Sequence, residues 1–186
     1  MEWFPDLQIG WPNGWIPLAL LSLTDGILFL AFPRAVVARL FDRSGWSQQQ
    51  IVFTVISKLC ALVCLAMLIL TPLKIGAVAF IVGVVVVVLG LMGLVKALLD
   101  FKNTPLDSPV TRGLYTLSRH PQIVMSSAVI LGGCVAIGSW SAMVMWLLAR
   151  LFGHFGIMAE EEVCLQQYGD EYRAYMKRVP RYFIFF

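Results

Sequence analysis

The sequence predicts an all-α integral membrane protein with about five transmembrane helices and a C-terminal cytosolic helical segment. Its 186 residues are 59% apolar and have a mean hydropathy of +0.81, whereas a soluble domain is roughly 45–50% apolar. The apolar residues are concentrated in long runs, which is the pattern of membrane-spanning helices. The basic residues gather in alternate connections between these runs, as the positive-inside rule requires. At this length we expect one domain, residues 1–186.

Five apolar runs define the predicted helices. They cover residues 15–32, 51–70, 75–99, 122–138 and 140–158. A helix needs roughly 20 residues to cross the bilayer core, with about 17–25 tolerated, so the last two runs are near the lower limit. A tight turn at Gly138 and Ser139 joins them, which favours a helical hairpin. A re-entrant pair that never crosses the membrane is the alternative.

The basic residues also predict the orientation. With the N-terminus outside, all the Lys and Arg residues except Lys58 and Lys74 fall on or near the cytosolic side. These are Arg34, Arg39, Arg43, Lys96, Lys102, Arg112, Arg119, Arg150, Arg173, Lys177, Arg178 and Arg181. The tryptophans at positions 3, 11, 15 and 140 gather at the outer interface, as an aromatic belt does. We therefore predict an outside N-terminus and a cytosolic C-terminus.

Small residues recur every seven positions along the third predicted helix. Gly76, Gly83, Gly90 and Ala97 would form one smooth face that permits a close helix approach. Packing within the chain is favoured over packing against a second subunit.

Ionisable residues also occur inside the apolar runs. Asp25 and Lys58 lie at similar depths in the first two predicted helices, which predicts an ion pair or else a polar contribution to a substrate cavity. His154 is expected to bond to a neighbouring helix, and contact with a bound cofactor is the alternative. The net charge of +3 is too small and too dispersed to indicate a nucleic-acid partner.

Two polar segments, residues 100–121 and 159–181, should face each other at the cytosolic surface because the predicted hairpin brings their ends together. The first carries cations and an aromatic residue, and the second begins with three acidic residues, 160–162. Such acids are costly beside a membrane unless they are solvated or paired. A solvated helix start followed by basic interfacial anchors is the simplest explanation. A zwitterionic, partly apolar cofactor such as S-adenosylmethionine would also suit these groups.

The spacing within these two segments resembles a known family. The pattern G-x-Y-x-x-x-R-H-P ends at Pro121, and E-E-x-x-L-x-x-x-G-x-x-Y-x-x-Y-x-x-R-V-P follows after one hairpin and ends at Pro180. This resembles the isoprenylcysteine carboxyl methyltransferase family and the wider group that includes membrane phospholipid N-methyltransferases. The resemblance covers roughly residues 100–181. It implies methyl transfer from S-adenosylmethionine, bound at the cytosolic side, to a lipophilic carboxylate, amine or thiol from the bilayer.

The resemblance also implies roles for individual residues. Those that would bind the cofactor are Tyr115, His120, Glu161, Glu162, Tyr172 and Tyr175. Arg119 and Arg178 match the family's arginines and would be catalytic, with Arg178 nearest the acceptor. No metal ion is expected. Two positions depart from the family pattern: Ile123 replaces a usual Tyr and Leu114 a common Pro.

Two other function classes remain open. Membrane sterol reductases that use NADPH also carry an S-R-H-P loop, which residues 118–121 match. Those proteins typically continue differently after the proline and lack the double glutamate. A non-enzymatic membrane scaffold or small transporter is the third possibility, and it predicts no binding of a soluble cofactor.

Overall fold

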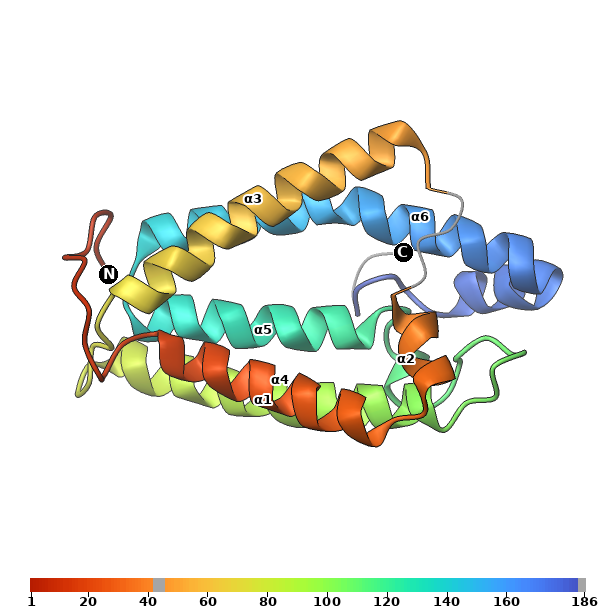
Figure 1. Ribbon diagram of the computed structural model, residues 1–186, viewed down its shortest axis with the longest axis horizontal. Helices are drawn as coiled ribbons and strands as arrows, with labels where there is room; N and C mark the ends of the chain where they lie inside the picture. The colour runs from red at the N-terminus through yellow and green to blue at the C-terminus, as the bar shows by residue number, and fades with distance from the viewer. Residues whose placement is uncertain (42–45, 184–186) are drawn as a thin grey trace.

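The computed structural model describes residues 1–41 and 46–183, and its regular elements are helices (Figure 1). They are α1 (Trp15–Ala31), α2 (Arg34–Leu40), α3 (Gln48–Leu70), α4 (Val78–Lys102), the 3-10 helix η1 (Gly113–Thr116), α5 (Pro121–Ala136) and α6 (Trp140–Arg178). No β-strand occurs in the described ranges. The predicted all-α fold class is confirmed.

All five predicted apolar runs form helices, but they differ in length. Helices α3, α4 and α6 are long and apolar enough to cross a membrane. Helices α1 and α5 are apolar but shorter, with 17 and 16 residues. These helices are typical of an integral membrane protein. The number of crossings and their orientation stay predictions.

Helix α6 continues well beyond the predicted end at residue 158. Its uninterrupted part, residues 140–168, corresponds to a length of about 43 Å at 1.5 Å per residue. The bilayer core is only about 30 Å thick, so the polar second half of α6 projects past the core. Gly169 interrupts the helix with a φ of 55° and a ψ of −125°. The chain then turns back, as the blue end in Figure 1 shows.

The short helix α2 was not predicted from the sequence. It starts directly after α1, where Phe32 is extended and Pro33 precedes the first helical residue. Seven residues are too few to show a helical repeat of apolar positions. This helix places Arg39 at the end of the bundle that carries the polar segments.

The helices pack in two main pairs, α4 with α5 and α3 with α6, and α1 lies along the first pair (Figure 1). The small-residue face brings α4 against α5. A Cβ atom on Gly83 would lie 2.5 Å from the carbonyl oxygen of Gly132, and one on Gly90 would lie 2.8 Å from a methyl of Val129. The predicted packing within the chain is confirmed for this face. Gly76 does not belong to it, because it precedes α4 and has no atom near its Cβ position.

The N-terminal segment covers one end of the bundle. The Glu2 N–H donates to the Gly138 carbonyl over 2.7 Å, and the Trp140 N–H donates to the Glu2 carbonyl over 2.8 Å. The Glu2 carboxylate pairs with Lys74 at 3.1 Å. Trp3 and Trp140 lie side by side, with ring centroids 6.3 Å apart. This end is the one that the sequence places outside, and the polar segments lie at the opposite end.

Two expectations about charged residues need correction. Among the described residues, Asp25 and Lys58 form no ion pair within 4 Å, so the predicted pair is wrong. Helix α1 packs mainly on α4 and α5 while α3 packs on α6, and Lys58 is exposed on α3. Arg150 lies well inside α6 rather than at its cytosolic end. Arg43 lies outside the described residues.

Candidate active site

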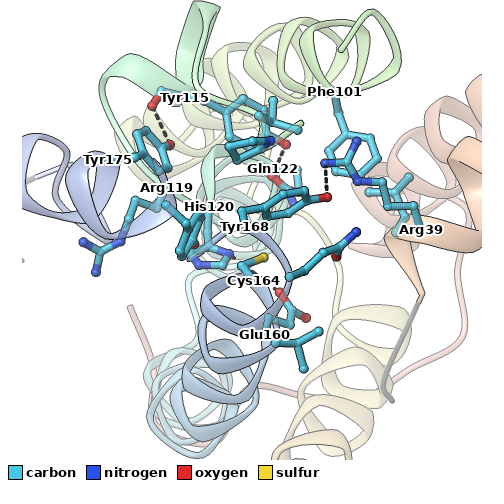
Figure 2. Close-up of a pocket in the computed structure, with 16 residues that line it drawn as sticks. Arg39, Phe101, Tyr115, Arg119, His120, Gln122, Glu160, Cys164, Tyr168 and Tyr175 are labelled. Atoms are coloured by element: carbon cyan, nitrogen blue, oxygen red, sulfur yellow. Dashed lines mark hydrogen bonds and ion pairs between the residues drawn. The ribbon is translucent and has the colours of Figure 1, made fainter. Parts of the chain in front are cut away.

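A pocket opens at the end of the bundle that carries both polar segments (Figure 2). Four parts of the chain form its wall: α2, the end of α4, the segment from residue 109 to the start of α5, and the polar half of α6. Residues about 40 apart in sequence thus face each other, as expected. The lining includes Arg39, Tyr115, His120, Glu160 and Tyr168.

Glu161 is the centre of a buried ion-pair cluster beside this pocket. Its side chain is 3% exposed. The Arg119 Nε donates to one carboxylate oxygen over 2.8 Å, and the Arg181 Nη2 donates to the other over 2.7 Å. The His120 Nε2 lies 3.2 Å from the first oxygen. We call Arg119, His120, Glu161 and Arg181 the ion-pair cluster.

The cluster keeps Glu161 ionised. Burial alone would raise the pKa of this carboxyl, but the hydrogen bonds to His120 and Arg181 and the charges of His120 and Arg119 outweigh burial and lower the pKa to about 2. Both carboxylate oxygens accept several hydrogen bonds within the protein. A carboxylate offers about four acceptor positions, so Glu161 has little capacity left for a ligand.

Arg119 anchors the loop to the far end of α6. Its Nη1 donates to the carbonyl oxygens of Met176 and Val179, each over 3.0 Å, and its backbone N–H donates to the Pro180 carbonyl over 3.0 Å. The Ser118 hydroxyl adds a bond of 2.8 Å to the Arg181 carbonyl. In Figure 2 the guanidinium of Arg119 points away from the centre of the pocket residues. The Arg119 guanidinium therefore satisfies the carbonyls that end α6.

The three consecutive glutamates point in three directions. Glu160 lines the pocket with its side chain 37% exposed, and its Oε2 lies 3.7 Å from the His120 Nδ1. Glu161 is buried in the ion-pair cluster. Glu162 is exposed on another side, where its Oε2 accepts a bond of 3.0 Å from Gln50 on α3. Successive helical residues are turned by about 100°, so only one glutamate of the three lines the pocket.

Tyrosines form much of the pocket wall. The Tyr115 hydroxyl donates to the Gln122 Oε1 over 2.6 Å, and the Tyr175 hydroxyl donates to the Tyr115 carbonyl over 2.7 Å (Figure 2). Tyr172 is buried beside Tyr175, with ring centroids 5.6 Å apart. Burial raises the pKa of all three phenols above the usual value. The wall therefore presents neutral hydroxyls and aromatic faces.

Gly113 explains why the first motif opens with glycine. Its φ of +61° favours glycine, and a Cβ there would collide with the Asp100 carboxylate. That carboxylate accepts the Leu114 N–H over 3.0 Å. A proline at position 114 would lack this N–H, so the leucine that departs from the family pattern gains a bond between the loop and α4.

The structure brings together most, but not all, of the residues predicted for the site. Tyr115, Arg119, His120, Tyr172 and Tyr175 line the pocket, and Glu161 lies directly behind His120. Glu162 and Arg178 are not part of the pocket lining, and both are exposed. His154 bonds to the Tyr182 hydroxyl at 2.8 Å rather than to a neighbouring transmembrane helix.

Sequence reasoning missed four residues at or beside the pocket: Arg39, Gln122, Glu160 and Arg181. Arg39 belongs to the unpredicted helix α2. Gln122 follows the R-H-P triplet directly, and Glu160 precedes the double glutamate, so both adjoin motif residues without belonging to the motifs. Arg181 follows the final Pro180 in the same way.

Comparison with known proteins identifies the family. The family model for phospholipid methyltransferases matches residues 71–171, which is more than half of the chain. The chain belongs to the phospholipid methyltransferase family. Its members are membrane methyltransferases, so the predicted resemblance is confirmed. No curated protein and no solved structure matches the chain. The matched residues include the first motif and the three glutamates, whereas Arg39, Arg178 and Arg181 lie outside them.

Proposed function

We propose that this methyltransferase takes its methyl group from S-adenosylmethionine bound in the pocket and transfers it to a lipophilic acceptor from the membrane. The observation that carries the proposal is the position of Glu160 and His120 at one side of a pocket whose wall also presents several aromatic rings. The acceptor would be a carboxylate, amine or thiol on an amphiphile. The apolar helices that lead to the pocket support its delivery from the bilayer.

The donor groups of the pocket fit this cofactor. S-adenosylmethionine has a cationic sulfonium, an amino acid end, ribose hydroxyls and an adenine ring. A half-exposed carboxylate such as Glu160 suits an ammonium or a hydroxyl group, because hydrogen bonds to an ionised acceptor are strong. The faces of Tyr115 and Tyr168 suit a sulfonium or a heteroaromatic ring.

The protein's contribution to the reaction is mainly positioning. When bound, S-adenosylmethionine supplies an electrophilic methyl group that a nucleophile attacks in line. The pocket has to hold both reactants in that geometry and to exclude water. The ion-pair cluster fixes His120 through Glu161. With an amine or thiol acceptor a proton must leave, and the pocket wall holds His120, whose neutral form accepts a proton.

A cysteine in the pocket wall is kept in its less reactive, protonated form. Cys164 lines it, and burial raises the pKa of this thiol to about 11. A thiol reacts chiefly as its thiolate, and at neutral pH this group is protonated. The enzyme's own sulfur therefore competes poorly with the acceptor for the methyl group.

Calorimetric titration of the detergent-solubilised protein tests the choice of cofactor. S-adenosylhomocysteine, the product form without the methyl group, is expected to bind, and NADPH is expected to give no heat of binding. Binding should also raise the melting temperature, because a ligand at about 100 times its Kd stabilises the folded state by about 2.7 kcal/mol. Binding of NADPH in place of S-adenosylhomocysteine would favour a reductase. Binding of neither would favour a scaffold or transporter.

A further inference from the structure

Arg39 connects three separate parts of the pocket rim. Its Nη1 donates to the Pro105 carbonyl over 3.0 Å, and its Nη2 donates to the Ser108 carbonyl over 2.7 Å and to the Tyr168 hydroxyl over 3.0 Å. Its guanidinium carbon also lies 5.1 Å from the ring centroid of Phe101. We call residues 103–112 the rim loop. One side chain on α2 thus connects the rim loop to the part of α6 just before its kink.

These partners are unusual for a cation because they are uncharged. Among the described residues, no carboxylate lies within 4 Å of the Arg39 guanidinium. The guanidinium instead bonds to two backbone carbonyls and a phenol between two aromatic rings, as Figure 2 shows for Tyr168 and Phe101. Arg suits this task because its planar fork presents several donors in fixed directions.

The rim that Arg39 holds borders a small pocket. The pocket has a volume of about 130 Å³, whereas pockets that bury ligands of drug size have roughly 300–1,000 Å³. A ligand with an adenosine and an amino acid end therefore needs the rim to part before it can be seated. Residues of α2, the rim loop and Tyr168 all contribute to the pocket wall.

We propose that Arg39 is a positioning residue that closes the rim over the methyl donor and that its bonds open and re-form each time a ligand is exchanged. This inference rests on the proposed function. It assigns a task to the first 70 residues of the chain, which lie outside the segment matched by the family. Arg39 acts by holding Tyr168 and the rim loop, so it controls the rates at which the ligand enters and leaves.

Binding kinetics distinguish closure from a merely structural contact. The rates at which S-adenosylhomocysteine binds to and leaves the immobilised protein would be measured for the natural chain and for Arg39→Ala. Both rates are expected to rise, and dissociation by about tenfold or more, because three hydrogen bonds that hold the rim are lost. The rates for Arg39→Lys should lie between those of the natural chain and of Arg39→Ala, since lysine keeps the positive charge but lacks the planar, several-donor guanidinium. Arg34→Ala, an exposed arginine on the same helix, should behave as the natural chain.

One further variant and a proteolysis experiment keep the test decisive. Tyr168→Phe retains the ring and removes one acceptor of Arg39 together with the long bond of 3.5 Å to the Leu106 carbonyl, so both rates should rise by a smaller factor. Trypsin sites at Lys102 and Arg112 flank the rim loop. S-adenosylhomocysteine should slow cleavage there in the natural chain but not in Arg39→Ala.

The outcomes separate the two proposals. If the natural chain binds S-adenosylhomocysteine while Arg39→Ala and Tyr168→Phe retain its rates and its ligand protection, Arg39 does not close the rim. If Arg39→Ala lowers the melting temperature while Tyr168→Phe leaves both rates unchanged, Arg39 stabilises the fold but does not control ligand exchange. If the natural chain does not bind the ligand at all, the proposed function fails and the closure proposal fails with it.

Discussion

Replacing Glu161 by glutamine is expected to lower the free energy of unfolding by about 3–5 kcal/mol, because removing one partner of a buried ion pair leaves the other charges uncompensated. Arg119 would lose its counter-charge while its side chain stays 3% exposed, and the three bonds from Arg181 would lose their charged acceptor. Thermal unfolding of the purified variant in detergent measures the loss.

The matched control is the next residue. Glu162→Gln changes an exposed side chain that bonds to Gln50, so stability should stay within about 0.5 kcal/mol of the natural chain.

The dependence of stability on pH provides a second check. The pKa of Glu161 is about 2 in the folded protein, against an ordinary value of 4.5 for an exposed glutamate, so its stabilisation is complete above pH 4.5 and is lost as the pH falls towards 2. Glu161→Gln should lack this part of the acid sensitivity. Equal stability of the two glutamine variants would contradict the ion-pair cluster.

Replacing Glu160 by glutamine is expected to weaken binding of S-adenosylhomocysteine by about ten- to a hundredfold and to leave stability nearly unchanged. A hydrogen bond to a charged group contributes about 1.5–3 kcal/mol, and about 1.4 kcal/mol corresponds to a factor of ten in Kd. Glu160 lines the pocket and is more than one-third exposed, so the folded state does not depend on it as it does on Glu161. Calorimetric titration gives the Kd, and a parallel melting curve gives the stability.

The neighbouring residues supply the comparison for this variant. Glu162→Gln should bind as the natural chain does, since Glu162 lies outside the pocket lining. Arg178→Ala should also leave the Kd nearly unchanged, because Arg178 is exposed and does not line the pocket. Normal binding by Glu160→Gln together with weakened binding by Glu162→Gln would mean that the helix presents a different face to the cofactor.

The features that the sequence predicted correctly are local or repetitive. Apolar runs of 16 residues or more locate the five helices, because each helix carries its own hydrophobic signal. The seven-residue spacing of Gly83 and Gly90 correctly predicted close packing within the chain. The two motifs predicted that residues near His120 and Glu161 would meet, since a single hairpin separates them.

The features that were missed depend on packing between distant segments. The motif gives the glutamates but not the rotation of α6, so it cannot show that Glu160 rather than Glu162 lines the pocket. The expected Asp25–Lys58 pair rested on equal depth alone, and depth does not determine which helices are neighbours. Arg39 has no motif around it, and its partners are mostly backbone carbonyls, which leave no trace in the sequence.

The most direct test of the account is transfer of a labelled methyl group. The purified protein would be incubated with S-adenosylmethionine labelled in the methyl group and with a membrane lipid extract, alongside Glu160→Gln and Glu162→Gln. The account predicts a labelled lipophilic product that forms with the natural chain and with Glu162→Gln, and much less of it with Glu160→Gln at a cofactor concentration near the natural Kd. The absence of any labelled product from folded protein, or equal product from Glu160→Gln, would contradict it.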